Sequence, residues 1–166
     1  MRNFILIFFT TLLFGCLSFN GSSEEVISKL KIEGKFYFKD LVKNRQYDVL
    51  LDNIEGGDVV LITNAFMLNR WADASTSLSL KYALSRAITK KPDEVMSLIP
   101  KYFSVSDVCT IPYVEGTIET ELSHIIQSLA ALSQSKKANN NIYRQCIDIY
   151  EDIKNNLTKD KSGIHS

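Results

Sequence analysis

The sequence predicts an all-α protein, either stacked helical hairpins similar to HEAT repeats or a small antiparallel helix bundle, behind an N-terminal signal peptide. Apolar residues recur at spacings of three and four along most of the chain, while alternation at period two is nearly absent. Short connections between the helical segments favour antiparallel neighbours. Removal of the signal leaves about 145 residues, a length that suits one core, so we expect a single domain over residues 24–157.

The first 23 residues have the pattern of an export signal. Arg2 precedes an apolar run over residues 4–14. This run has the length of a signal-peptide core and falls short of the roughly 20 residues that a membrane-spanning helix needs. The sequence therefore predicts a signal peptide over residues 1–23 and a mature protein that works outside the cytoplasm.

The signal can end in two ways, and both stay open. Leu13, Gly15 and Cys16 resemble the bacterial lipobox, and this resemblance implies that the thiol of Cys16 is acylated and anchors the protein. Ordinary cleavage is the alternative, because the triplets at 16–18 and 21–23 place small residues where a signal peptidase reads. We expect either a free periplasmic protein or one held at the membrane by lipid, facing the periplasm.

The first half of the domain is expected to hold four helices. Two short ones over 22–31 and 36–43 flank a glycine, and a compact one presents an apolar face over 47–54 before a glycine pair ends it. Asp58 is a good N-cap for a segment that runs to about Trp71 and is apolar nearly all round. That segment is the expected buried central helix.

The second half is expected to hold four more helices. Pro92 suits the first turn of a helix, Pro100 should end or kink that helix, and Thr117 can cap a long amphipathic one. The inward faces of these two helices are expected to include Tyr102 and Ile126. The remaining predicted segments are a polar turn over 74–77, a helix with its apolar stripe over 80–88, an irregular stretch over 104–116, a last helix over 142–157 and a flexible tail over 158–166.

Two cysteines, Cys109 and Cys146, remain once the signal is gone. In an oxidising compartment, an isolated pair is best explained by one disulfide. In the chain-entropy model, closing a loop of that length stabilises the fold by about 4 kcal/mol. The alternative is a pair of buried free thiols, since isolated cysteine is among the most buried residue types.

Residues 82–115 carry a recognisable order of residue types. An Ala-rich helix with Ala83 and Ala87 is followed by Pro92, by the pair Val95 and Met96, and then by the run Cys109-Thr110-Ile111-Pro112-Tyr113-Val114-Glu115. This order resembles small, exported, uncharacterised proteobacterial helical proteins with a Pro-x-x-Val-Leu and a Cys-x-x-Pro-aromatic-aliphatic-Glu pattern. The resemblance implies a helical fold and a disulfide to a cysteine in the last helix. It implies no activity and no catalytic residue.

Charge and motif content argue against several classes of function. The formal net charge is +0 and no basic stripe occurs, so no nucleic-acid partner is expected. The two histidines, His124 in a long helix and His165 in the tail, do not combine with the cysteines into a metal site, and His124 is expected to be partly exposed. No nucleophile elbow, phosphate loop or dinucleotide motif is present. We expect no catalytic, cofactor-binding or metal-binding residue.

Three carboxylates, Glu115, Glu119 and Glu121, cluster at the expected start of the long helix. Negative charge there stabilises the positive end of the helix dipole, and this is the favoured interpretation. The alternative is a glycosidase-like acid pair.

Four aromatic or cationic residues are the expected contacts for a partner. Three adjacent aromatics over 36–38 cannot all face inward on one helix, so Phe36 or Tyr37 should be exposed. Arg70 and the single tryptophan, Trp71, belong to the types enriched in interface hot spots, although core packing is the favoured role for Trp71.

These observations predict a non-catalytic envelope protein that binds another envelope protein, as an adaptor or as an immunity protein against a toxin delivered to the periplasm. The only membrane contact expected is a lipid on Cys16. A cell-wall hydrolase that uses Glu115 or Glu119, or a carrier of a small ligand, is the alternative.

Overall fold

The computed structural model describes residues 21–113 and 115–163, and these residues form helices and connecting turns with no strand among them. The all-α prediction is therefore confirmed. The predicted signal, the Cys16 lipidation site and His165 lie outside the described residues. The helices are α1 (Ser23–Glu33), α2 (Lys35–Lys43), α3 (Gln46–Gly56), α4 (Val59–Thr63), α5 (Ala65–Asn69), α6 (Ala74–Ala87), α7 (Pro92–Met96), α8 (Val105–Val108), α9 (Ile118–Gln134) and α10 (Asn141–Gly163).

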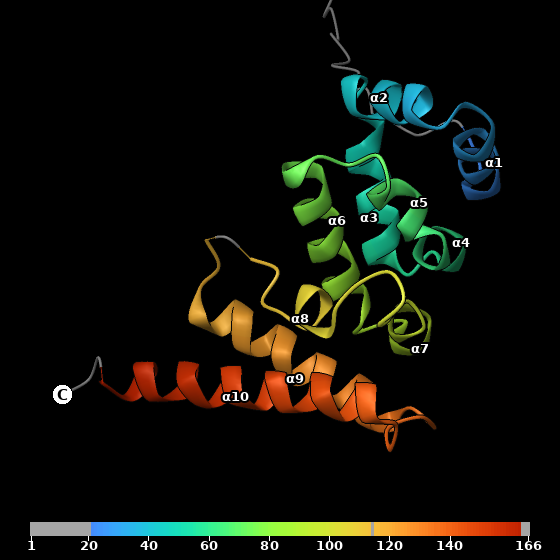
Figure 1. Ribbon diagram of the computed structural model, residues 1–166. Coiled ribbons are helices and arrows are strands. Elements are labelled where there is room, and N and C mark those ends of the chain that lie inside the picture. The colour runs from blue at the N-terminus through green and yellow to red at the C-terminus, as the bar shows by residue number, and fades with distance from the viewer. Residues whose placement is uncertain (1–20, 114, 164–166) are drawn as a thin grey trace, which may run out of the picture.

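The helices pack in successive groups along the molecule (Figure 1). Helices α1 and α2 form one end, α3 and α6 pack against each other in the middle, and the long pair α9 and α10 forms the other end. The short helices α4, α5, α7 and α8 fill the space between these groups. A single apolar core runs through all of them, so residues at both ends share one folded unit.

Helices α1 to α3 lie close to their predicted positions. The hydroxyl of Ser22 caps α1 by accepting a bond from the backbone N–H of Glu25 at 3.2 Å. Gly34 then joins α1 to α2 without a loop, because its φ of +55° lies in a region that favours glycine. The predicted apolar face of α3 is buried, and it consists of Tyr47, Leu50, Leu51 and Ile54.

The predicted single central helix is wrong, because the segment is split into α4 and α5. Asp58 caps α4 as expected, but the side chain of Asn64 donates to the carbonyl of Val60 at 2.9 Å, and that of Thr63 donates to the carbonyl of Val59 at 2.7 Å. Such side-chain bonds compete with the helical ladder and favour a break. Only one face of the pair is buried, and Val59 is 41 % exposed.

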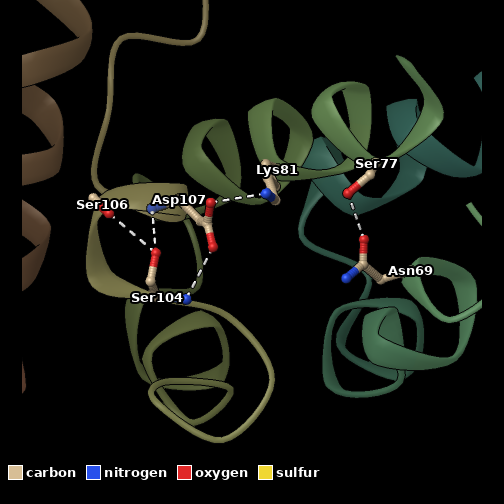
Figure 2. Close-up of polar contacts among 6 residues, drawn as sticks. All are labelled: Asn69, Ser77, Lys81, Ser104, Ser106 and Asp107. Carbon is tan, nitrogen blue, oxygen red and sulfur yellow. Dashed lines mark hydrogen bonds and ion pairs between the residues drawn. The ribbon is translucent and has the colours of Figure 1, made fainter. Parts of the chain in front are cut away.

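Helix α6 begins earlier than predicted, so the expected polar turn over 74–77 is wrong. Asp73 and Thr76 form a capping box: the carboxylate of Asp73 accepts from the backbone of Thr76 at 2.9 Å, and the Thr76 hydroxyl accepts from the backbone of Asp73 at 2.9 Å. The hydroxyl of Ser77 donates to Asn69 at 2.7 Å and ties α5 to α6 (Figure 2). The polar residues therefore start the helix rather than interrupt it.

Helix α7 begins at Pro92 as predicted, but α8 was not expected within the irregular stretch over 104–116. Ser104 and Asp107 form its capping box, and Asp107 also pairs with Lys81 of α6 at 2.8 Å (Figure 2). The predicted inward position of Tyr102 is wrong. Its ring is 37 % exposed and stacks on Phe66, with ring centres 4.2 Å apart.

Helices α9 and α10 lie side by side and antiparallel, with Thr117 as the N-cap of α9 (Figure 1). The buried face of α9 differs from the predicted one: Ile126 is 57 % exposed, whereas His124, expected to be partly exposed, is only 4 % exposed. The buried face of α9 is rotated because polar groups from other helices provide a buried site for the imidazole of His124. Helix α10 continues to Gly163, past the predicted end at Leu157.

Asp93 in the first turn of α7 connects this helix to the turn between α9 and α10. Its carboxylate accepts hydrogen bonds from the hydroxyl groups of Ser135 and Tyr143, each at 2.5 Å. These two bonds hold the pKa of Asp93 below its usual value.

The predicted disulfide between Cys109 and Cys146 is confirmed. The two Cα atoms are 5.5 Å apart, and both residues are almost completely buried. Cys109 ends α8, and Cys146 lies in α10. The bond therefore ties the terminal helix pair to the middle of the molecule.

Replacing both cysteines, as C109A/C146A, should lower the free energy of unfolding by about 4 kcal/mol, because the unfolded chain regains the entropy of an open loop. Urea-induced unfolding followed by circular dichroism measures the change. Treatment of the unaltered protein with a reductant is the matched control and should give a similar loss. A difference below about 1 kcal/mol would contradict the expected role of the bond.

Candidate functional site

An apolar hollow of about 690 Å³ lies where α1 ends, α2 begins and α5 passes beneath them. Its floor consists of Leu30, Phe66, Met67 and Trp71, and most of the surface exposed within it is apolar. The other lining residues are Lys31, Ile32, Glu33, Gly34, Lys35, Phe36 and Arg70. We refer to this site as the apolar hollow.

The structure brings three of the four predicted partner contacts to the apolar hollow. Phe36 is 81 % exposed on its edge, Arg70 is exposed, and Trp71 is half-buried. Tyr37 lies outside the hollow, and its ring is 5.7 Å from the ammonium group of Lys29. Trp71, for which core packing was the favoured role, is thus only partly buried. It lines the hollow together with Arg70, whose guanidinium lies 5.0 Å from the indole ring.

Ile32 is a further residue of this site, which sequence reasoning missed. It is 81 % exposed, as much as Phe36, and it lies four positions before it. On a continuous helix this spacing would place both side chains on one face. The spacing of Ile32 and Phe36 in the sequence therefore indicated this site, but the glycine between the two residues obscured it.

Close packing between Gly34 and Trp71 shapes the hollow. A Cβ atom added at Gly34 would lie 3.2 Å from Cζ2 of the indole, closer than an ordinary contact. The absence of a side chain lets the ring lie directly against the backbone between α1 and α2. The position of Trp71 therefore depends on glycine at this turn.

Trp71 also lines a second hollow of about 470 Å³. It shares Lys35 and Trp71 with the apolar hollow and has Phe38, Val42 and Ala72 as its apolar lining. The remaining lining residues are Lys39, Lys43, Asp73 and Thr76. The two hollows together form a surface that runs along α2 with the indole at its centre.

A polar pocket of about 500 Å³ lies elsewhere, between the ends of α3 and α6 and the first half of α9. Arg86 crosses it, forming an ion pair with Glu55 and donating to the carbonyl of Pro112 at 2.6 Å. Glu119 also lines this pocket, whereas Glu115 is exposed and does not. The other lining residues are Thr89, Lys90, Tyr113, Thr120, Ser123, His124 and Gln127.

A buried polar network borders the polar pocket. The hydroxyl of Ser85 donates to the carbonyl of Thr110 at 2.8 Å and lies 3.4 Å from Nε2 of His124 and 3.3 Å from the hydroxyl of Tyr150. A serine beside a histidine is the pairing of a nucleophile with its base. Here Ser85 is 0 % exposed and already donates to a carbonyl, so the network joins α6, α9 and α10 rather than presenting a nucleophile.

Burial controls the ionisation of this network. Desolvation, reinforced by the positive charge of Arg86, lowers the pKa of His124 from 6.5 to about 4. Burial raises the pKa of Tyr150 to about 12. Both groups are therefore neutral at pH 7, and a buried charge is avoided.

Comparison with known proteins identifies no relative: no family model, curated protein or solved structure matches the chain. Within residues 21–113 and 115–163, none of the helices has the length and apolar content to cross a membrane. The same part of the chain contains no group of three histidine, cysteine or acidic side chains placed to hold a metal ion. The hollows and the polar pocket are therefore the features of the molecule that bear on its function.

The variant G34A should lower the free energy of unfolding by about 1–3 kcal/mol, because alanine is strained at this φ and its methyl group displaces the indole. Urea unfolding monitored by circular dichroism gives the loss, and the emission of Trp71 reports the displacement. G56A is the matched control, since nothing lies within 4 Å of its added methyl group. Equal stability of the two variants would contradict the proposed packing.

Stability should fall as the pH drops from about 6.5 to about 4, by up to about 3 kcal/mol, because the unfolded chain protonates His124 more readily than the folded chain does. Urea unfolding at several pH values measures the slope, and H124Q should remove it. The carboxyl groups of Asp73, Asp93 and Asp107 have pKa values below 3.8. Their protonation therefore removes their contributions to the free energy of unfolding at lower pH. An unchanged slope in H124Q would assign the effect to other groups.

Proposed function

We propose that this chain is an exported envelope protein that acts without catalysis by binding another envelope protein through the apolar hollow. The observation that carries the proposal is the exposure of Ile32 and Phe36, each 81 %, on the edge of a hollow with Trp71 in its floor. Exposing large apolar side chains to water is unfavourable, and neighbouring ones at a concave site are typical of interfaces.

Export is the second part of the proposal, and two features of the chain support it. The first 23 residues have the pattern of a signal peptide. If the signal is processed at the lipobox, Cys16 is the site of lipidation. The disulfide between Cys109 and Cys146 is of the kind that persists in oxidising compartments. A location in the periplasm, free or lipid-anchored, agrees with both features.

The partner in this proposal is either the client of an adaptor or a toxin that the chain neutralises as an immunity protein. Both roles need a rigid surface that binds without chemistry. A preformed hollow on packed helices loses little conformational entropy when a partner binds. This property suits tight binding by a small protein.

A small-ligand carrier would need a sizeable apolar cavity, whereas a cell-wall hydrolase would use the polar pocket, which Glu119 lines together with His124. The features of that pocket favour this alternative less. The carboxylate of Glu55 is already paired with Arg86, and the hydroxyl of Ser85 is inaccessible. Glu115, the other predicted acid, does not reach the pocket lining.

A photo-crosslinking amino acid at position 36, in the full chain expressed in its host, should give one dominant protein adduct, because this side chain lies at the edge of the hollow. Mass spectrometry of the adduct identifies the partner, and a toxin there would select the immunity role. The control places the same amino acid at position 126, which is 57 % exposed on α9 and outside both hollows. The absence of an adduct, or the same adducts from both positions, would refute this binding site.

A further inference from the structure

We infer that the segment bound by the two hollows is an acidic peptide segment with apolar anchor residues. This inference rests on the proposed function and adds the chemistry of the partner. It comes from the distribution of charge around Trp71, which the composition of the chain does not reveal.

Positive charge is concentrated on this surface. The formal charge of the whole chain is +0, yet the linings of the two hollows contain five cationic residues and two carboxylates, which leaves three positive charges. Three of the lysines recur at intervals of four along α2, so they form a row of about 12 Å beside the apolar floor. The cationic residues are Lys31, Lys35, Lys39, Lys43 and Arg70, and the acidic ones are Glu33 and Asp73.

These cations have no acidic partner among the described residues, whereas several other basic side chains do. Lys81, Arg86 and Lys154 each form an ion pair with a carboxylate. None of the five cations of the hollows forms one within residues 21–113 and 115–163. Their charges are therefore available to carboxylates of a partner, and salt will weaken that attraction.

The shape of the surface favours a peptide segment over a lipid bilayer. Two hollows of about 690 and 470 Å³ flank a half-buried Trp71, and side chains of a partner can fill them. A bilayer would also accommodate exposed apolar side chains such as Ile32 and Phe36, but a segment with projecting side chains can in addition fill both hollows. The apolar anchors of an acidic segment can pack on the floor, and its carboxylates can pair with the cations at the edge.

The test uses phage-displayed random peptides, selected on the purified mature chain and counter-selected on F36S. The selected peptides should combine apolar residues with an excess of Asp and Glu. Trp71 is the single tryptophan of the chain. Binding of a selected peptide, synthesised without tryptophan, should therefore shift the emission of Trp71 to the blue. The reversal K35E/K39E should weaken binding at least about tenfold, and the milder K35Q/K39Q should weaken it less. The control K136E/K137E alters exposed lysines outside both hollows and should leave binding unchanged.

Four results would overturn the inference. They are selection of neutral or basic peptides, no enrichment over F36S, equal binding by K35E/K39E, and a shift of Trp71 emission with vesicles of phosphatidylglycerol and phosphatidylethanolamine that matches the peptide effect. Crosslinking from position 36 does not depend on the charge of the partner. A protein adduct there, together with any of these four results, would retain the proposed function and reject the acidic partner.

Discussion

The contact between the backbone of Gly34 and the ring of Trp71 determines the form of the N-terminal surface. With a positive φ and no side chain, Gly34 lets α2 follow α1 directly and leaves room for the indole against the turn. Trp71 then lines both hollows. Because both hollows share this ring, a change at Gly34 affects the whole surface rather than one part of it.

The opposite end of the molecule is held by different forces. There the disulfide and the buried network of Ser85, His124 and Tyr150 join α9 and α10 to the middle helices. Satisfied polar groups in a core specify one arrangement, since any other leaves a buried donor or acceptor unpaired. The structure therefore combines a rigidly attached C-terminal pair with an N-terminal end whose apolar surface is incompletely covered.

Periodicity was enough to predict the all-α class and most helix positions, because these depend on local spacing, and the isolated pair of cysteines was enough to predict the disulfide. It failed where short side chains act on the backbone: Asp73 and Ser104 begin helices in segments that look like turns, and Asn64 divides a segment that looks like one helix. The burial of His124 could not be predicted from the sequence for another reason. Its partner Ser85 is 39 positions away in the chain, so no local pattern contains the pair.

The charge of the chain shows the same limit at the level of function. A formal charge of +0 argued against a nucleic-acid partner, but the net charge of the composition averages over the entire surface. In the folded chain, carboxylates neutralise bases such as Lys81 and Arg86, while the lysines of α2 lie beside an apolar floor and form no ion pair with the residues that the structure describes. Neutrality of the whole is thus compatible with a strongly cationic site. A partner interacts with the local electrostatic field of the site. That field depends on which charges the fold pairs with one another.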